Sequence, residues 1–263
     1  MRITSIRLAV ANTIFTHAMK SITLLARLAV SALLLLSVAC RSAKSSSNNG
    51  FKRIFDGKTL NGWKGDTNYW RVEDGEIVGE VTPQTILKNN TFLIWTGGQP
   101  SDFELKVTYR ISAKGNSGVN YRSVTVDSLP FALKGYQADI DGKDKYGNGY
   151  PRHTGQNYEE RGRQFLAVRG QKVTIETGQK PIVTDTLGTK EALLKSINYD
   201  GWNELHIIAK GNHIQHFING TLMSEVTDND TANRRLSGLI GVQVHVGPPM
   251  KIEFKEFLLK TLR

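Results

Sequence analysis

The sequence has one cysteine, Cys40, in 263 residues. A single cysteine excludes an intramolecular disulfide, so the fold must be held together by its buried core. Residues 1–39 contain no aspartate or glutamate, although they carry four basic residues. Their apolar run, Leu28 to Ala39, is bounded by Lys20 and Arg27 and falls short of the roughly 20 residues that a membrane-spanning helix needs. We therefore predict an export signal rather than a spanning helix.

The chain also lacks a Lys/Arg-rich block and a recognisable nucleic-acid motif. It has 34 basic and 24 acidic residues in all, and because four basic residues lie in the leader, the rest carries only a modest positive charge. Such a charge is typical of a solvated surface, and we expect no nucleic-acid partner. No period of 20–50 residues recurs, which argues against a propeller or a solenoid.

The cysteine directly follows Leu36-Ser37-Val38-Ala39 at the end of the apolar run. This segment resembles the lipobox of bacterial lipoproteins, in which the cysteine is lipidated and becomes the mature N-terminus. Ser37 departs from the pattern, which usually carries Leu at that position. The resemblance implies that residues 1–40 are a lipoprotein signal segment, with Met19 as the start of ordinary length, and that Cys40 anchors the exported protein in a membrane.

The next residues suggest how the anchor is joined to the rest of the chain. Arg41, rather than Asp, follows the cysteine, and this resembles lipoproteins sorted to the outer membrane. Residues 41–50 are rich in Ser and Asn, which predicts a flexible tether.

From residue 51 to 263 the pattern is that of strands. In Phe103–Ile111 apolar and polar residues alternate, so one face of this strand is core. Asp74-Gly75 separates two apolar stretches and predicts a tight hairpin. Leu205–Ala209 and His213–Ile218 form a predicted meander, and the one plausible helix is short, around Lys190 to Ser196. Strands with one apolar and one polar face predict an all-β sandwich of two stacked antiparallel sheets.

Three predicted strands carry polar residues on the face away from the core. Gly135–Asp141 places Gln137, Asp139 and Asp141 on one side. Asn120 with Arg122, and Gln243 with His245, are similar alternating pairs. A row of amides and carboxylates on a sheet suits sugar hydroxyls, although a single strand of this kind can equally be a solvated outer face.

A polar segment, residues 155–163, lies between these strands in the sequence. Its composition, G-Q-N-Y-E-E-R-G-R, predicts a loop dense in charge and hydrogen-bonding groups. Loops at the rim of a rigid sandwich often carry function, but a solvated charged loop would look the same.

Eight short motifs occur in the order seen in the 3-keto-disaccharide hydrolase domain family, which the chain resembles from residue 51 to its C-terminus. They are Phe51 to Trp63, the Asp-Gly hairpin after Trp70, Asp102-Phe103-Glu104-Leu105, Asn116-Ser117-Gly118, Gly135-Tyr136-Gln137, Trp202-Asn203-Glu204, Ile218-Asn219-Gly220 and Gly241-Val242-Gln243-Val244-His245. Each motif is weak alone, and the ordered set is specific.

The resemblance implies a concanavalin A-like jelly roll that acts on 3-keto-glycosides, either as a 1,2-lyase or as a hydratase that completes net hydrolysis. After Gly135 the family often has Tyr-Glu-x-Gln, whereas Tyr136-Gln137-Ala138-Asp139 stands here. The sequence is closer to a subgroup with Gln-Ala-Asp followed by a Tyr-Glu-Glu loop. This departure leaves the identity of the catalytic base open.

A ketone at C3 makes the C2 proton acidic, so the site needs a base, an acid for the departing oxygen and donors for the enolate. The candidate acid and base residues are Asp139, Glu159 and His245. The candidate substrate-binding residues are Gln137, Arg122, Asn120, Tyr158, Arg163, Gln243 and Trp95. No cofactor is required, although a divalent cation held by Asp139 and His245 is an alternative way to stabilise the enolate.

The other histidines receive weaker assignments. His206, His213 and His216 are expected to be surface or packing residues, and His153 lies in a predicted loop. None of them is a first choice for catalysis.

Two other functions fit the same fold class. Glucanases of the concanavalin-like type resemble one another in a Glu-x-Asp-x-x-Glu strand that carries two catalytic carboxylates, and Gln137 stands in place of the first Glu; an amide cannot serve as the nucleophile. A lectin-like module would present Trp95, Tyr121 and the polar strand to a glycan without chemistry. Whether the candidate acid and base residues share one concave cleft distinguishes the enzyme from the lectin.

Overall fold

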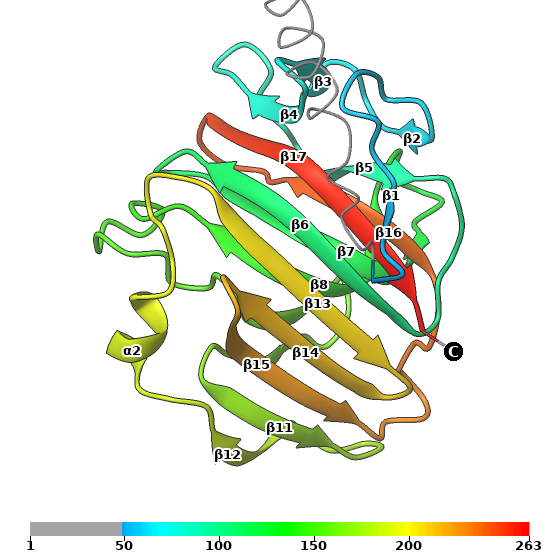
Figure 1. Ribbon diagram of the computed structural model, residues 1–263, viewed down its shortest axis with the longest axis vertical. Helices are drawn as coiled ribbons and strands as arrows, with labels where there is room; N and C mark the ends of the chain where they lie inside the picture. The colour runs from blue at the N-terminus through cyan, green and yellow to red at the C-terminus, as the bar shows by residue number, and fades with distance from the viewer. Residues whose placement is uncertain (1–48, 263) are drawn as a thin grey trace, which may run out of the picture. The chain divides into compact units, whose positions relative to one another are not determined.

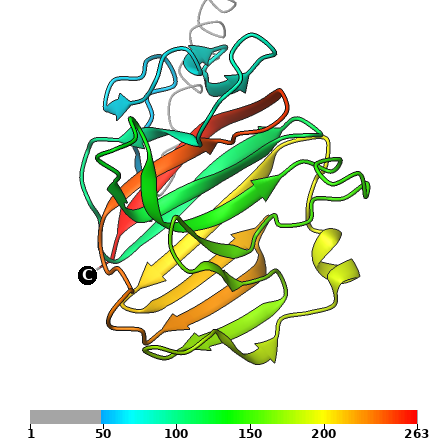
Figure 2. The same ribbon diagram turned by 180° about the vertical axis from the view of Figure 1, so that it is seen from behind.

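The computed structural model describes residues 49–262, and the predicted signal segment, Cys40 and nearly all of the predicted tether lie outside them. Within the described residues, no helix is long and apolar enough to cross a membrane. Two stacked sheets make up the fold, with the larger sheet in front in Figure 1 and the smaller sheet in front in Figure 2.

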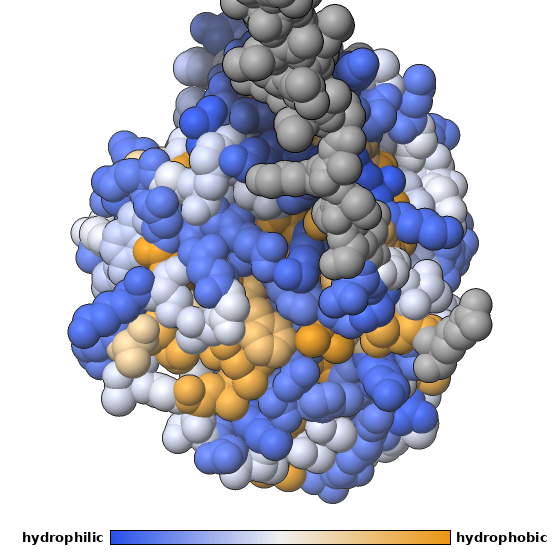
Figure 3. All heavy atoms as spheres, viewed as in Figure 1, coloured by the Kyte–Doolittle hydropathy of each residue, from blue (hydrophilic) through white to orange (hydrophobic). Residues whose placement is uncertain are grey.

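The larger sheet has ten strands. Nine lie side by side in the order β12 (Ile182–Thr186), β11 (Gln171–Ile175), β15 (Thr221–Asp228), β14 (His213–Ile218), β13 (Asn203–Lys210), β6 (Phe103–Ile111), β17 (Met250–Thr261), β4 (Glu76–Val81) and β3 (Trp70–Glu73). The tenth, β1 (Lys52–Arg53), pairs with the end of β17. Figure 3 shows the outer face of this sheet, where hydrophilic side chains dominate the upper half and a band of apolar ones crosses the lower half.

The smaller sheet has seven strands. Their order is β10 (Gln164–Ala167), β9 (Asn157–Glu160), β8 (Leu133–Asp141), β7 (Asn116–Thr125), β16 (Leu239–Val244), β5 (Thr91–Trp95) and β2 (Trp63–Lys64). The all-β jelly-roll sandwich predicted from the sequence is confirmed. In both sheets the paired strands run antiparallel, with one exception in the larger sheet, where β11 runs parallel to β15.

The core lies between the two sheets and follows the period-two alternation of the strands. Leu105 and Val107 of β6 have no exposed surface, while Glu104 and Lys106, which alternate with them, lie on the other face and form salt bridges. From the smaller sheet, Ala138 and Val242 are equally buried. Each fully buried aliphatic side chain contributes roughly 1.5–3 kcal/mol, so this inner layer holds the fold without a disulfide.

The local turns follow the sequence signals. Asp74 and Gly75 both have positive φ, at 52° and 82°, so they join β3 to β4 through the predicted tight hairpin. The short helix α2 (Lys190–Leu194) lies where a helix was expected and is capped by Thr189, whose hydroxyl accepts a hydrogen bond from the Ala192 amide.

One prediction of local structure was wrong, and it concerns residues 155–163. This segment is not a loop, because Asn157–Glu160 form β9 and pair with β8 along Gly135–Ala138. A turn at Arg161 then leads into β10. Strand geometry sends Tyr158 and Glu160 to one face of the sheet and Glu159 to the other, which decides their roles.

Candidate functional site

The outer face of the seven-stranded sheet, which points away from the core, carries the polar strand predicted from the sequence. On β8, Tyr136, Ala138 and Ile140 face the core, and Gln137 and Asp139 face outward. Asp139 pairs with Gly118 of β7, and the next strand, β16, contributes Gln243 and leads to His245. The sheet thereby brings side chains from distant parts of the sequence onto one surface.

A pocket of about 250 Å³ lies on this face, and we refer to it as the polar pocket. It is lined by Asn90, Asn116, Gln137, Asp139, Tyr146, His153, Tyr158, Glu160, Phe165 and His245. Four of the predicted site residues thus share one hollow: Gln137, Asp139, Tyr158 and His245. The convergence of the Gln137 strand, the Tyr158 segment and the His245 strand is what the sequence argument required.

Two amides hold the Asp139 carboxylate at the floor of the polar pocket. Gln137 Nε2 donates to Oδ1 and Gln156 Nε2 donates to Oδ2, both at 2.6 Å. The pKa of Asp139 is raised to about 7, mainly by burial and to a lesser extent by the neighbouring carboxylates Asp141 and Glu160, against the lowering effect of the two amides. A carboxyl group with this pKa exchanges a proton readily at neutral pH.

The Gln137 side chain lies flat across β7 because residue 118 is a glycine. A Cβ atom on Gly118 would stand 2.5 Å from Cγ and Cδ of Gln137. Gln137 Oε1 accepts a hydrogen bond from Gln243 Nε2 at 3.2 Å, and the same nitrogen lies 3.3 Å from Glu160 Oε2. A continuous chain of polar contacts therefore links Asp139 to Glu160.

Glu160 is the second carboxylate of the polar pocket. Its Oε1 accepts hydrogen bonds from Arg161 at 2.7 Å and from Asn90 at 3.2 Å. Asn90 Oδ1 in turn accepts from the Val246 amide, which ties this wall of the pocket to the end of β16. Because Arg161 and Asn90 donate hydrogen bonds to it, the Glu160 carboxylate has a fixed position and orients the residues around it.

Two histidines line the polar pocket. The Nδ1 atom of His245 donates to the backbone oxygen of Val246, so Nε2 is left as an acceptor in the neutral ring. Burial lowers the pKa of His245, and the nearby Lys145 lowers it further. Burial also lowers the pKa of His153, whose Nδ1 lies 2.9 Å from the Tyr146 hydroxyl. Both imidazoles are therefore mainly neutral at neutral pH.

Asp141 positions the segment that carries His153. Its carboxylate accepts hydrogen bonds from the backbone amides of Arg152, His153 and Thr154 at 3.0–3.1 Å. The sequence placed Asp141 on the same outward face as Asp139, but its side chain is buried as an anchor for this loop. These bonds fix the backbone of residues 152–154 and thereby help to hold His153 at the pocket.

Aromatic rings form the rim. The centroid of the Phe165 ring lies 5.2 Å from that of Tyr158 and 5.8 Å from that of His153, and the Tyr146 centroid lies 5.0 Å from His153. Phe165 and Tyr146 are 49% and 41% exposed. Exposed rings beside a polar floor are suited to the apolar faces and the hydroxyl groups of a sugar.

Sequence reasoning missed six of the lining residues or gave them little weight: Asn90, Asn116, Tyr146, His153, Glu160 and Phe165. Alternation in β9 would have found Glu160 together with Tyr158, had the segment been read as a strand. The loop residues Asn90, Tyr146 and His153 carry no periodic signal, because their positions depend on tertiary contacts.

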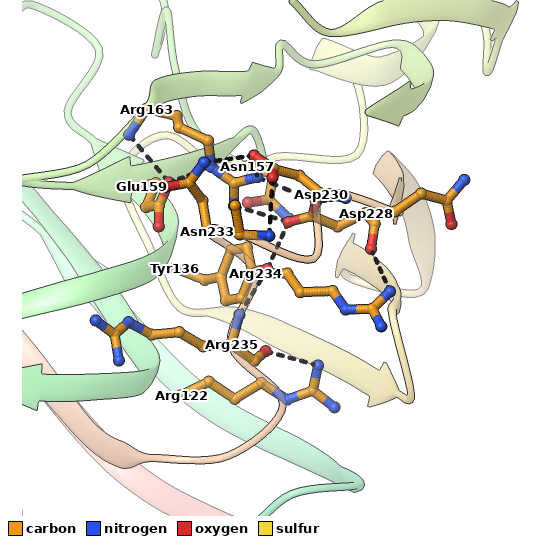
Figure 4. A network of polar contacts seen from close by, with 12 residues as sticks. Arg122, Tyr136, Asn157, Glu159, Arg163, Asp228, Asp230, Asn233, Arg234 and Arg235 are labelled. Atoms are coloured by element: carbon orange, nitrogen blue, oxygen red, sulfur yellow. Dashed lines mark hydrogen bonds and ion pairs between the residues drawn. The ribbon is translucent and has the colours of Figure 1, made fainter. Parts of the chain in front are cut away.

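The structure places Glu159 away from the polar pocket, which corrects its assignment as an acid or base. Its carboxylate points to the inner side of the sheet, where Oε2 accepts hydrogen bonds from the amide and Nε of Arg163 at 3.0 and 2.6 Å (Figure 4). Arg163 also pairs with Asp228 of the other sheet at 2.7 Å. Burial alone would lower the pKa of Arg163, but the hydrogen bonds to Asp228 and Glu159 raise it. The ion pair between Arg163 and Asp228 joins the two sheets. Arg163, like Glu159, does not line the polar pocket.

Arg122 is likewise structural. It is fully buried, and its guanidinium donates to the backbone oxygens of Ser101, Gly211 and Arg235 and pairs with Asp102. Figure 4 shows it beside the 234–235 segment, apart from Glu159 and Arg163. Its φ of 47° marks the irregular point in β7 at which its side chain leaves the polar row. It clamps loops at one end of the sandwich.

Four more assignments need correction. Asn120 and Gln243 lie on the pocket side of the sheet but have no exposed surface, so they form a layer beneath the lining residues. Within residues 49–262, Asn120 Nδ2 and Oδ1 and Gln243 Oε1 have no hydrogen-bond partner. Trp95 pairs with Trp63 and packs against the core, and Tyr121 is buried in it, so neither ring is presented to a glycan by this face.

The remaining histidines do not line the polar pocket. His206 and His213 bond to Glu104 and Glu225 on the larger sheet. His216 is fully buried between the sheets, as a packing residue. In the described part of the chain, no three His, Cys, Asp or Glu side chains cluster closely enough to hold a metal ion.

Comparison with known proteins gives a family match over most of the chain. Residues 50–260 match the family described as the 3-keto-alpha-glucoside-1,2-lyase-like domain. A search of curated proteins found no match to the chain.

Solved structures of similar fold include two crystal structures of candidate glycosyl hydrolases from Parabacteroides distasonis. The first is 20% identical, with a TM-score of 0.54, over 84% of this chain and 98% of that one. The second is 19% identical, with a TM-score of 0.53, over 81% and 99%. At these identities the likeness shows a shared fold.

Proposed function

The chain belongs to the 3-keto-alpha-glucoside-1,2-lyase-like domain family, and from this premise we propose that it cleaves 3-keto-glycosides by taking the C2 proton and eliminating the C1 substituent. The family membership supports a role with carbohydrates. The observation that carries the proposal of catalysis is the Asp139 carboxyl group, with its pKa of about 7, at the floor of a pocket of sugar size.

The reaction needs only proton transfers and one bond cleavage. A C3 ketone stabilises the carbanion at C2, so a carboxylate of moderate strength can remove that proton. The electron pair forms the C1–C2 double bond, the C1–O bond breaks, and the departing oxygen takes a proton. The products are the 2-hydroxy-3-keto-glucal and the free aglycone. Addition of water across the new double bond then gives the 3-keto-sugar and completes net hydrolysis.

We assign the base to Asp139, because its two amide partners fix its direction and its raised pKa matches neutral pH. The side chains of Asn116 and Tyr158 line the same pocket and form no hydrogen bond with another residue in 49–262, so the amide and the hydroxyl are free to donate to the enolate oxygen. His245 lines the same pocket, and its Nε2 is available as an acceptor for a sugar hydroxyl.

The acid for the departing oxygen is assigned to His153. It lines the polar pocket and also a second hollow beside it, so it lies where the bond between sugar and aglycone would cross. With the Tyr146 hydroxyl donating to Nδ1 of the neutral ring, the tyrosine proton passes to Nδ1 as Nε2–H goes to the departing oxygen, so that no imidazolate forms.

Turnover and binding by Asp139→Asn test this proposal against a lectin-like role. We expect kcat/KM for a 3-keto-glucoside to fall about 10³-fold, within the range of general-base catalysis, while calorimetry shows the substrate still bound. Asp185→Asn, at an exposed position on the sheet edge, is the matched control and should keep full activity. Binding without turnover by the unaltered protein would instead establish a lectin.

We also propose that Cys40 carries a lipid that anchors the protein in the cell envelope, in the outer membrane. The lipobox-like sequence before Cys40 and the arginine after it support this location. Mass spectrometry of the N-terminal peptide should find acylated Cys40, and Cys40→Ser should move the protein from the membrane to the soluble fraction. An unmodified, soluble parent protein would contradict the anchor.

A further inference from the structure

A second hollow of about 440 Å³ opens beside the polar pocket, and we refer to it as the basic hollow. It is lined by Tyr150, Arg152, His153, Gln156, Phe165, Val168, Arg169 and Lys190. Two of these, His153 and Phe165, also line the polar pocket, and Gln156 donates to Asp139. A molecule that fills both spaces therefore passes within reach of Asp139 and His153.

The basic hollow has three cationic side chains and no carboxylate in its lining. Arg169 Nη1 donates to the backbone oxygens of Pro151 and Thr154 at 3.0 Å, the Arg152 guanidinium lies over the Tyr146 ring, and Lys190 Nζ donates to the Tyr150 hydroxyl at 2.8 Å. None of the three forms a salt bridge with a carboxylate of residues 49–262. Their charges are thus available to an anionic ligand.

The same hollow has an apolar side. Phe165 and Val168 are 49% and 40% exposed. Tyr150 adds a third apolar surface, and Lys190 lies 4.1 Å from the centre of its ring. A ligand that matches this lining has a flat apolar part and an anionic group at its edge.

We propose that the basic hollow binds the aglycone, and that the preferred substrates are 3-keto-glycosides whose aglycone joins a flat apolar portion to an anionic group such as a carboxylate. This assignment rests on the proposed lyase function for the position of the sugar ring. The keto-sugar lies over Asp139, the scissile bond passes His153, and the anionic end meets Arg152, Arg169 and Lys190.

Two substrates that differ only in charge test the assignment. These are the 3-keto-glucosides of 4-hydroxyphenylacetate and of 4-hydroxyphenylacetamide, in which the altered group is separated from the leaving oxygen by the ring. We expect kcat/KM to be about tenfold higher for the acid, the effect of one charge-assisted hydrogen bond at a partly exposed site. The double variant Arg152→Met with Lys190→Met should bring the ratio to within twofold of one.

Lys180→Met is the matched control, because Lys180 is exposed and does not line the basic hollow. It should keep the preference for the acid. Equal turnover of both substrates by the unaltered protein would overturn the assignment, as would a preference that survives in the double variant.

Binding of the free aglycones separates this inference from the proposed reaction. In an NMR titration, 4-hydroxyphenylacetate should shift the amide signals of Phe165 and Val168, and the amide compound or the double variant should give at least tenfold weaker binding. If no 3-keto-glucoside is turned over but this titration succeeds, the reaction fails and the anion site stands. If turnover occurs and the titration shows no difference, the anion site fails alone.

Discussion

Glu159 and Glu160 are adjacent in the sequence and point to opposite faces of the seven-stranded sheet. The Glu159 carboxylate pairs with Arg163 on the inner side, and the Glu160 carboxylate lines the polar pocket with Asn90 and Gln243. The two side chains have the same chemistry, so the pleat of β9 alone gives one a structural role and the other a place in the site.

This relationship predicts different effects of the same substitution. Glu160→Gln should lower kcat/KM at least tenfold, because it disturbs the contacts that orient Gln137 and Asn90. Glu159→Gln should keep its activity and lose about 1–3 kcal/mol of unfolding free energy, since Arg163 loses one of its buried partners. Steady-state kinetics and urea unfolding measure both. The reverse pattern would mean that the faces are assigned wrongly.

Gly118→Ala should inactivate through Gln137. The added Cβ would stand 2.5 Å from the Gln137 side chain, so that side chain must move and its hydrogen bond to Asp139 is lost. We expect at least a tenfold loss of kcat. The double variant Gly118→Ala with Gln137→Ala relieves the clash and should regain any lost stability without regaining activity. Full activity in Gly118→Ala would show that Gln137 does not position Asp139.

Activity should rise with pH through about 7, because the ionised form of Asp139 is the base. Stability should respond with the opposite sign. The pKa of Asp139 is about 7 in the folded protein and near 3.8 in the unfolded chain. Between pH 3.8 and 7 the folded state therefore binds more protons than the unfolded state, and its stability falls as pH rises. Asp139→Asn should remove that loss. A pH–rate profile that is flat from pH 5.5 to 8.5 would contradict the role of Asp139.

His216 should make the fold sensitive to acid. Its Nε2 lies 2.8 Å from the Tyr121 hydroxyl and its Nδ1 lies 3.2 Å from the Gln156 oxygen, and burial lowers its pKa to about 3. The unfolded chain binds this proton near pH 6.5, so stability falls as pH drops from 6.5 toward 3. His216→Gln should flatten that slope, measured by urea unfolding at several pH values. Equal slopes in the parent protein and in His216→Gln would remove His216 as the cause.

The sequence predicted the sandwich because alternation survives wherever one face of a strand is buried. Phe103–Ile111 and the Asp74-Gly75 hairpin lie where the pattern placed them. Gln137, Asp139 and His245 were found for the same reason, since strand geometry assigns their faces without knowledge of the partners.

The errors arise where tertiary contacts decide. Arg122 sits at an irregular position of β7 with positive φ, so simple alternation sent it to the wrong face. The composition of residues 155–163 suggested a loop, although their backbone pairs with β8. His153 is held at the pocket in part by the bond from its backbone amide to Asp141, a contact across 12 residues that no local pattern encodes.

The most direct test of the proposed reaction follows the C2 proton. The protein is incubated with a 3-keto-glucoside that carries deuterium at C2, and aglycone release is timed while NMR identifies the sugar product. The account predicts a primary isotope effect on kcat/KM and a 2-hydroxy-3-keto-glucal that has lost the label. Release of aglycone at an undiminished rate, with the deuterium retained at C2, would contradict it.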